Sequence, residues 1–343
     1  MVFQLNPDVY SEEVCPLLYP DDVKYTVMIP TYRRLDILKE AVKSVLDQGL
    51  KSSLAVIIVD NDDKGDQNLD DYAYSLRDSN VALYRNKSNL GMVGNWNRCI
   101  ELSVTDRLII LHDDDLMTTG SIKLLYSLGH GNQALIGGRW ELFGSNVSRF
   151  QKLLTSCSNS WYRFTSNNNG HSTDWSYYKI LSSHPVSASS MSFCKSSALS
   201  IGGYSEDVWP ATDWCFFLNY LEKYGGKKSY KITLKYRVEV NISSSPDLLM
   251  DIPTAEMNIK MIFLENHLES KLRYLIAKIG FMIQKKSEHI GIMSRLKGSR
   301  KPENLSFLQK QYVRFKKIGL KFLAHSIIYV GLCFKKVTSD FRH

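Results

Sequence analysis

The chain has 343 residues, of which 44% are hydrophobic and 23% charged, as in ordinary folded proteins; a collagen-like chain, a disordered chain and a disulfide scaffold are excluded. Its formal net charge of +8 is uneven: residues 271–343 hold 17 Lys or Arg and 3 Asp or Glu, whereas the rest holds 26 and 32. This pattern argues against a uniformly basic nucleic-acid binder and predicts a local anionic partner for the tail.

The six cysteines are scattered and include no C-x-x-C pair, so we expect reduced thiols rather than a zinc site or a disulfide framework. The N-terminus lacks the basic-then-apolar pattern of a signal peptide. The longest apolar run of the tail, residues 327–334, is too short to span a bilayer. We therefore expect a cytoplasmic protein that is not integral to the membrane.

The first half of the chain alternates apolar runs with helical patterns. After an irregular leader over residues 1–23, short buried strands are predicted at 25–29, 56–59, 81–84 and 108–111, the first of them ending at Pro30. Apolar residues at i and i+4 predict a helix over 37–46, which Asp36 would cap, and another over 96–104. Such alternation predicts an α/β fold with a doubly wound, mainly parallel sheet.

The second half is less regular. Residues 150–185 show no clear pattern, 191–194 resemble a strand, and 216–224 carry a helical aromatic stripe that ends at 225–228. From about residue 253 the pattern is helical. We therefore divide the chain into an N-terminal leader (1–23), a catalytic domain (24–250) and a basic helical C-terminal region (251–343).

Polar clusters follow three of the predicted strands, at residues 30–34, 60–63 and 112–115. Ligands of doubly wound sheets bind beyond the carboxyl ends of the strands, so we expect these clusters to converge there. The third cluster contains consecutive carboxylates, which raise one another's pKa unless a cation neutralises them. Mn²⁺ or Mg²⁺ would do so and would also hold a diphosphate. A bare acidic triplet is otherwise most often a solvated turn.

Five segments in order resemble the family 2 glycosyltransferases, which have the GT-A fold. They are YTVMIPTYRRLDILKEAVKSVLDQ (25–48), VIIVDN (56–61), NLGMVGNWN (89–97), HDDD (112–115), and GGY (202–204) followed by TDW (212–214). Each segment alone is weak, but their order and spacing over about residues 24–225 are specific.

The resemblance implies roles for individual residues. Tyr32 would stack on the base of a nucleotide, Arg34 would meet the phosphates, and Asp60 would accept a hydrogen bond from a uracil or thymine. Asp115 would bind the metal and Asp213 would act as the general base. Further contacts to the donor are expected from Pro30, Thr31, Asn89, Gly91, Asp113 and Asp114, the last through the ribose or the metal shell.

The implied reaction is a single displacement that inverts the anomeric carbon and needs no enzyme nucleophile. One departure concerns the base: the family usually has Glu-Asp where this chain has Thr212-Asp213. Glu206-Asp207 is the rival position, and Asp213 could instead be a plain helix cap.

Several weaker features leave alternatives open. Residues 311–315 (QYVRF) resemble a signature of processive synthases but lie far from Asp213, which favours a chance match. Trp140 and His184 line either the acceptor pocket or the core, and His112 is read as a packing residue. The tail segment 316–336 has a basic amphipathic pattern, suited to an anionic membrane surface or to a helical subdomain on the core.

The sequence thus predicts a metal-dependent glycosyltransferase of surface-polysaccharide synthesis, of the O-antigen or capsule type. The favoured donor is a UDP-sugar, with a dTDP-sugar such as dTDP-rhamnose second. The acceptor would be a glycan or a polyprenyl-diphosphate-linked oligosaccharide, met at the inner face of the cell membrane. The rivals are a nucleotidyltransferase, although residues 30–34 lack the glycine of its phosphate loop, and a non-catalytic sugar-nucleotide-binding relative.

Overall fold

The computed structural model describes residues 10–144, 147, 172–176, 181, 187–238, 246–267, 276–283, 285 and 327. The described residues fall into two compact units. Those within 1–176, 186–206 and 219–241 form the first unit, and those within 177–185, 207–218 and 242–343 form the second. The expected domain spans, 24–250 and 251–343, stay predictions.

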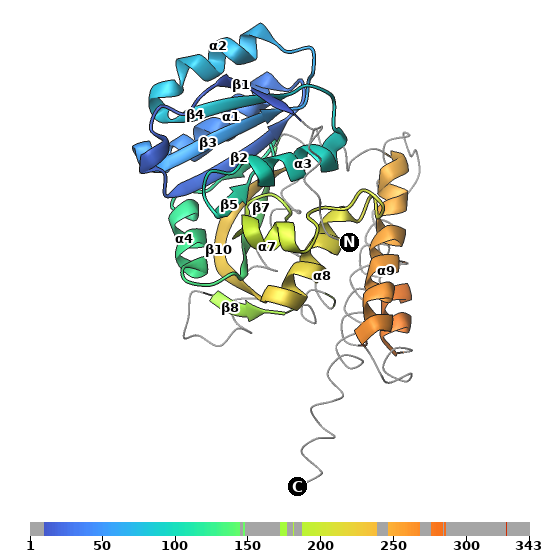
Figure 1. Ribbon diagram of the computed structural model, residues 1–343. Helices are drawn as coiled ribbons and strands as arrows, with labels where there is room; N and C mark the ends of the chain where they lie inside the picture. The colour runs from blue at the N-terminus through green and yellow to red at the C-terminus, as the bar shows by residue number, and fades with distance from the viewer. Residues whose placement is uncertain are drawn as a thin grey trace. The chain divides into compact units, whose positions relative to one another are not determined.

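The first unit is built on one sheet (Figure 1). Its strands run in the order β1-β4-β3-β2-β5-β9-β7-β10-β6, and β8 also pairs with β10. The four central strands β4, β3, β2 and β5 are parallel, as are β7 and β10, whereas the other pairings are antiparallel. The expected α/β fold with a mainly parallel sheet is therefore confirmed. The strands are β1 (Ser11–Cys15), β2 (Tyr25–Thr31), β3 (Leu54–Asp60), β4 (Val81–Asn86), β5 (Arg107–Ile110), β6 (Leu116–Met117), β7 (Leu135–Phe143), β8 (Ser172–Trp175), β9 (Met191–Cys194) and β10 (Gly226–Arg237).

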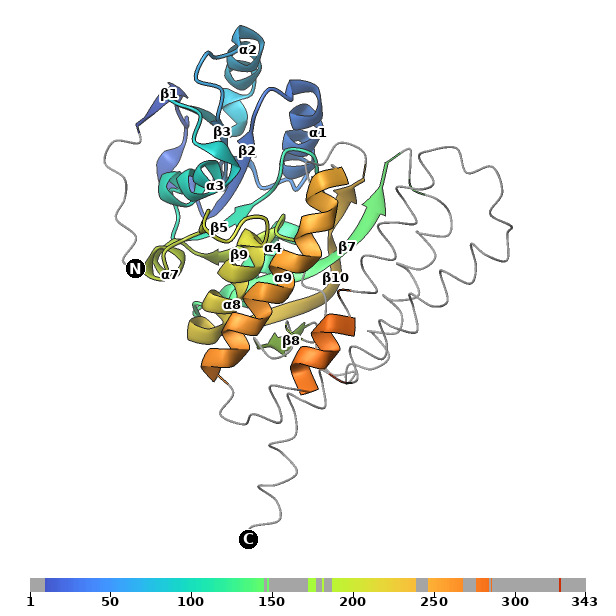
Figure 2. The ribbon, with the colours of Figure 1, turned by 90° about the vertical axis from the view of Figure 1, so that its right-hand side faces the viewer.

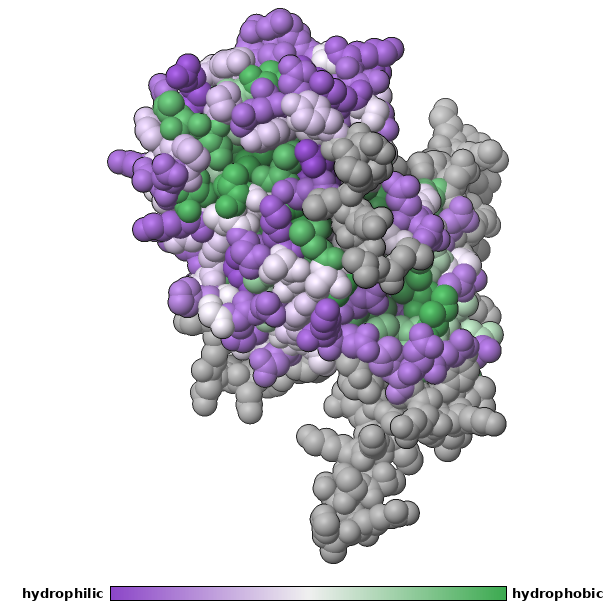
Figure 3. Space-filling view, viewed as in Figure 1, coloured by the Kyte–Doolittle hydropathy of each residue, from purple (hydrophilic) through white to green (hydrophobic). Residues whose placement is uncertain are grey.

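Helices cover both faces of this sheet, and Figure 2 shows α1 and α3 on opposite sides of β2. The buried sides of α1, α2 and α4 share one apolar cluster with alternate residues of β2 and β3, while α3 contacts the opposite face together with α7. The outer side of α2 is hydrophilic (Figure 3). The helices are α1 (Leu35–Leu46), α2 (Gln67–Ser75), α3 (Gly91–Leu102), α4 (Ser121–Gly129), α7 (Lys195–Ser200), α8 (Thr212–Tyr224) and α9 (Pro246–His267), with 3-10 turns η1 (Pro20–Asp22), η2 (Lys51–Ser53) and η3 (Arg77–Ser79).

The central strands form where the sequence is continuously apolar. All seven residues of β3, LAVIIVD, are buried, because helices cover it on both faces. In α1 the buried residues Leu38, Ala41, Val42 and Val45 repeat at helical spacing, which is the stripe that packs on the sheet. These elements confirm the predicted strands and the predicted helix over 37–46.

Three local expectations are wrong. The leader is not irregular throughout, because Ser11–Cys15 forms the edge strand β1 against β4. β2 does not end at Pro30: the ring is tolerated because Pro30 pairs only with β3, β5 being paired with residues 26–28 alone. Asp36 does not cap α1, whose N-cap is Arg34; Asp36 lies within the first turn instead.

The second unit contains residues 212–218 of α8, the helix α9 and helical residues 276–283. Its core is aromatic: Trp214, Phe216, Phe217, Phe263 and Phe281 are buried. Lys260 is 2% exposed, and its ammonium lies 3.8 Å from the centroid of the Trp214 ring. The expected helical C-terminal region is thus present in residues 246–267 and 276–283.

The tail features predicted over 311–315 and 316–336 lie outside the described residues, apart from residue 327. The described helices include none that combines the length and the apolar character needed to cross a membrane.

Candidate active site

The loop after β2 is tied to the acidic run after β5. Thr31 Oγ1 donates a hydrogen bond of 2.7 Å to Asp113 Oδ2. The Arg34 guanidinium pairs with both oxygens of Asp113 and, at 3.3 Å, with Asp114 Oδ2. The predicted convergence of these strand ends is therefore observed, and it brings together Thr31, Arg34, Asp113 and Asp114.

Asp113 is held by protein groups rather than left open to a ligand. Its carboxylate is 1% exposed, and both oxygens accept hydrogen bonds from Thr31 or Arg34. Burial raises the pKa of Asp113 to about 6, against the lowering effect of Arg34. The residue thus fixes the loop and the guanidinium in place.

Asp115 is in the opposite situation. It is 0% exposed; Oδ1 accepts a hydrogen bond of 3.0 Å from the backbone N–H of Arg237, and Oδ2 has no hydrogen-bond partner among the described groups. Burial, and next the charge of Asp114, raises the pKa of Asp115 to about 8, against the lowering effects of the Arg237 N–H and of the nearby Ser189 hydroxyl. An orphaned buried oxygen of this kind costs free energy unless something binds it.

One ligand atom each of His112, Asp114 and Asp115 lies within 4.8 Å of the others. Two carboxylate oxygens and one imidazole nitrogen suit a divalent cation, and the cation would supply the missing partner of Asp115. These residues therefore fit the expected Mn²⁺ or Mg²⁺. Asp113, the first carboxylate of the run, is not part of this group.

His112, which the sequence analysis read as a packing residue, lies in this group. Its ring stacks on Trp96, with centroids 5.0 Å apart and planes at 14°. Burial lowers the pKa of His112, against the raising effect of the Asp114 charge. The sequence alone carries no clear signal, because residues 113 and 114 form a turn, closed by a hydrogen bond of 3.2 Å from the Asp115 N–H to the His112 carbonyl oxygen.

The segment after β3 is joined to the loop before α3 by side-chain amides. Asn61 Nδ2 donates to Asn89 Oδ1 at 2.8 Å and to the Gly91 carbonyl at 3.1 Å, and Asn61 Oδ1 accepts from the Leu90 N–H at 2.9 Å. Gly91 has φ +69°, a conformation that favours glycine. The predicted residues Asn89 and Gly91 are therefore fixed beside the carboxyl end of β3, and Asn61 connects them.

Asp60 is more enclosed than expected for a residue that meets a base. It is 1% exposed; Oδ1 accepts from the Asp62 N–H and Oδ2 from Arg85 Nε, each at 3.0 Å. Arg85 also pairs with Asp70 on α2. Desolvation raises the pKa of Asp60, and hydrogen bonds from Asp62 and Arg85 oppose it. Both carboxylate oxygens of Asp60 are thus used to hold the loop after β3 in place.

Tyr32 and Arg33 form the open rim of the site. Tyr32 is 41% exposed, and the Arg33 guanidinium lies 5.0 Å from the centroid of its ring. Arg33 also makes a bidentate pair with Asp62, at 2.6 and 3.0 Å. An exposed aromatic ring held beside a strand end is suited to stacking on a planar ligand.

Asp213 lies in the second unit, in the first turn of α8. Its Oδ1 accepts a hydrogen bond of 2.8 Å from the Trp214 N–H. Desolvation raises the pKa of Asp213 to about 6, while hydrogen bonds from the backbone and the charge of Lys260 lower it. A carboxylate with a pKa near neutrality has the properties of a general base.

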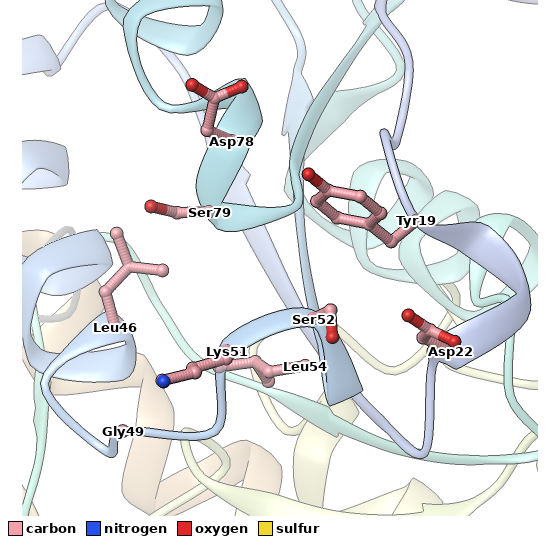
Figure 4. A pocket seen from close by; sticks show the side chains of 9 residues that line it. All are labelled: Tyr19, Asp22, Leu46, Gly49, Lys51, Ser52, Leu54, Asp78 and Ser79. Atoms are coloured by element: carbon pink, nitrogen blue, oxygen red, sulfur yellow. The ribbon is translucent and has the colours of Figure 1, made fainter.

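Of the other predicted residues, Trp140 packs against Tyr236 beside the core, and His184 lies outside the described residues. A hollow of about 440 Å³ lies elsewhere, at the amino ends of β3 and β4. Figure 4 shows its lining side chains, which include Tyr19, Lys51 and Asp78. None of the predicted site residues contributes to it.

A family model and a curated relative both match this chain. The model of "Glycosyl transferase family 2" matches residues 26–191. An uncharacterized glycosyltransferase of Mycoplasma genitalium is 26% identical over 135 residues, which are 39% of this chain and 45% of that protein. The match therefore spans less than half of the relative's length.

Two solved structures share the fold. The Pyrobaculum calidifontis mannosyltransferase PcManGT, in complex with GDP-Man and Mn²⁺, is 13% identical with a TM-score of 0.55, over 90% of this chain and 87% of that one. The S. aureus TarS 1-349 fragment, in complex with UDP-GlcNAc, is 15% identical with a TM-score of 0.51, over 90% and 91%. At these identities the likeness concerns the fold alone.

Proposed function

We propose that the chain is a glycosyltransferase whose residues 26–191, matched by the family 2 model, transfer a sugar from a nucleoside diphosphate to an acceptor hydroxyl, with inversion. The observation that carries the proposal is the orphaned oxygen of buried Asp115 beside Asp114 and His112. Those groups lie beyond the carboxyl ends of parallel strands, where doubly wound sheets bind their ligands.

The nucleotide would occupy the edge between the loops after β2 and β3. The exposed ring of Tyr32 offers a stacking surface for the base. Pro30 and Thr31 form the wall at the end of β2, and Asn89 and Gly91 form the wall before α3. We assign Asp60 to holding this loop in shape through Arg85 and the Asp62 N–H. A UDP-sugar is the favoured donor, and a dTDP-sugar is the runner-up.

Arg34 and the acidic run would meet the diphosphate. A Mn²⁺ or Mg²⁺ ion bound by Asp114 and Asp115 would neutralise charge on the leaving diphosphate. Arg34 keeps Asp113 and Asp114 oriented, and its side chain is still 28% exposed, which leaves it open to a phosphate oxygen. Asp113 contributes by fixing Arg34 and Thr31.

Asp213 would act as the general base. As the acceptor oxygen bonds to the anomeric carbon, the bond from that carbon to the β-phosphate oxygen breaks, and the hydroxyl proton passes to the Asp213 carboxylate. The nucleoside diphosphate leaves with the electron pair of the broken bond. One displacement of this kind inverts the anomeric configuration, and it needs no covalent enzyme intermediate.

The acceptor we propose is a glycan or a polyprenyl-diphosphate-linked oligosaccharide of surface-polysaccharide synthesis, met at the cytoplasmic face of a membrane. The support for this finer statement is the resemblance of the chain and the basic pattern of residues 316–336. Both points stand as proposals beside the glycosyltransferase assignment.

The test is release of nucleoside diphosphate from a panel of UDP-, GDP- and dTDP-sugars with Mn²⁺ or Mg²⁺, with and without EDTA and a polyprenyl-diphosphate-linked acceptor. We expect one nucleotide class to react, and EDTA to abolish the reaction. Release of pyrophosphate from a nucleoside triphosphate and a sugar phosphate would favour a nucleotidyltransferase instead. Tight UDP binding by calorimetry without turnover in any condition would favour a binding relative.

A further inference from the structure

The His112 side chain has a setting that a packing residue does not need. It follows β5 by two positions, and its backbone N–H donates to Ser189 Oγ at 3.0 Å. The residue as a whole is partly buried, and one ring nitrogen lies within 4.8 Å of an oxygen of Asp114 and of Asp115. Within the described part of the chain, no hydrogen bond involves that ring. The nitrogen therefore faces the carboxylates without being bonded to them.

A second observation at the same place indicates a missing ligand. Asp115 is 0% exposed and its Oδ2 has no partner among the described groups. Neither a water-exposed turn nor an ordinary buried ion pair leaves a carboxylate oxygen in this state. A cation between Oδ2 and the imidazole nitrogen would satisfy both groups at once.

Aromatic packing also fixes the orientation of the His112 ring. Trp96 stacks on it at 14°, and Tyr204 contacts Trp96 edge-on, with ring centroids 5.2 Å apart. Asn97 fixes the backbone of Tyr204 by two hydrogen bonds of 2.8 Å, one accepted and one donated. Groups that orient a metal ligand from its outer side commonly strengthen metal binding.

The geometry points to a mixed nitrogen–oxygen metal centre in which His112 is a direct ligand beside Asp114 and Asp115, so that Mn²⁺ is bound in preference to Mg²⁺. Mg²⁺ selects oxygen ligands in octahedral geometry, whereas imidazole suits first-row transition metals. The inference deepens the proposed function and rests on it for the use of the metal. Trp96 is a positioning residue that keeps the imidazole aimed at the ion.

The direct test is Mn²⁺ bound to the full chain, measured by electron spin echo spectroscopy. A ¹⁴N coupling from one imidazole is expected in the wild type and should vanish in His112→Ala. Because the wild-type spectrum needs no substitution, this test does not depend on whether a variant folds. Mn²⁺ bound without nitrogen coupling would overturn the inference.

Affinity provides the matched comparison. Calorimetry with MnCl₂ and MgCl₂ should give a ratio of Mn²⁺ to Mg²⁺ affinity that falls about tenfold or more in His112→Asp, which replaces nitrogen by oxygen. Trp96→Phe should weaken Mn²⁺ binding less than His112→Ala does. An unchanged ratio in folded His112→Asp would contradict the inference.

Failure here can be told apart from failure of the proposed function. If Mn²⁺ binding is lost in Asp115→Asn and unaffected in His112→Ala, the carboxylate site and the transferase proposal stand, and His112 is not a ligand. If the wild type binds neither metal and still releases nucleoside diphosphate in EDTA, both are wrong.

Discussion

The two edges of the sheet in the first unit treat buried polar side chains differently. At the amino edge, Asn80 is 0% exposed and fully used: its Oδ1 accepts from the Tyr19 N–H, and its Nδ2 lies 3.3 Å from the carbonyl oxygens of Tyr19, Ser52 and Leu54. At the carboxyl edge, Asp115 is equally buried but keeps one oxygen without a partner among described groups.

The difference distinguishes a buried polar side chain that stabilises the fold from one that is available to a ligand. A buried amide whose hydrogen bonds are all made connects three segments and stabilises the fold. A buried carboxylate with an orphaned oxygen does the reverse, since it costs stability until a ligand binds. Changes at the amino edge should therefore lower stability and spare activity, whereas changes at the carboxyl edge and at the proposed base should lower activity first.

The largest effect is expected for Asp213→Asn. Removal of the general base should lower kcat by roughly 10²–10⁴-fold, with little change in KM for the donor. In the wild type kcat should fall about tenfold per unit of pH below about pH 6, because the Asp213 pKa is raised to about 6 and the base must be deprotonated. This pH limb should disappear in the variant.

Glu206→Gln is the matched control for that experiment. We expect it to keep the wild-type kcat and pH limb. Loss of the limb in Glu206→Gln and its survival in Asp213→Asn would reassign the base to the rival position.

Arg34→Met should reduce both stability and activity. The change leaves Asp113 buried without its cation, which we expect to lower the free energy of unfolding by about 1–3 kcal/mol in urea titrations. The double variant Arg34→Met/Asp113→Asn should recover much of that stability, because the unpaired charge is gone, but not the activity. Full recovery of activity would mean that Arg34 acts only through Asp113.

Asn80→Ala tests the amino edge. It removes several backbone contacts and places alanine at φ +60°, so we expect a loss of about 1–3 kcal/mol in the free energy of unfolding with kcat unchanged in the folded protein. Asn80→Gly can adopt the same backbone conformation, so its free energy of unfolding should fall less than that of Asn80→Ala. A fall in kcat larger than the unfolded fraction of the variant explains would mean that the amino edge also serves activity, which would contradict the distinction between the two edges.

The smallest effect is expected for Tyr32→Ala. Loss of stacking worth about 0.5–1.5 kcal/mol should raise the donor KM roughly two- to twelvefold. Tyr32→Phe should stay within about twofold of wild type. An equal donor KM in Tyr32→Ala and Tyr32→Phe would mean that the nucleobase does not stack on this ring.

The central strands and the family resemblance were predictable because they depend on continuous apolar runs that end in polar residues. β2, β3, β4 and β5 all follow this pattern, and the match of the family 2 model to residues 26–191 agrees with the resemblance. β10 was missed because five of its twelve residues are Lys or Arg and it is buried only at intervals. β1, with the sequence SEEVC, was missed for the same reason: an edge strand needs little apolar surface.

The division of labour among the acidic residues was not predictable. The sequence shows three identical residues in a row and cannot tell their roles apart. Only the packing shows that Thr31 and Arg34 hold Asp113, whereas Asp115 is left with an orphaned oxygen. His112 was discounted for a similar reason, since its stack on Trp96 depends on how α3 lies against the sheet. Asp60 likewise proved to be enclosed by Arg85, which lies 25 residues further along the chain.

The central claim is that the buried carboxylate at the carboxyl edge is kept for metal-dependent glycosyl transfer. The most direct measurement is metal-dependent release of nucleoside diphosphate by Asp115→Asn. It is compared with wild type and with Asp78→Asn, which changes an exposed carboxylate at the amino edge. We predict a loss on the order of 10²–10³-fold in Asp115→Asn, a thermal midpoint in EDTA no lower than wild type, and unchanged activity in Asp78→Asn. Wild-type turnover by Asp115→Asn, persisting in EDTA, would contradict the account.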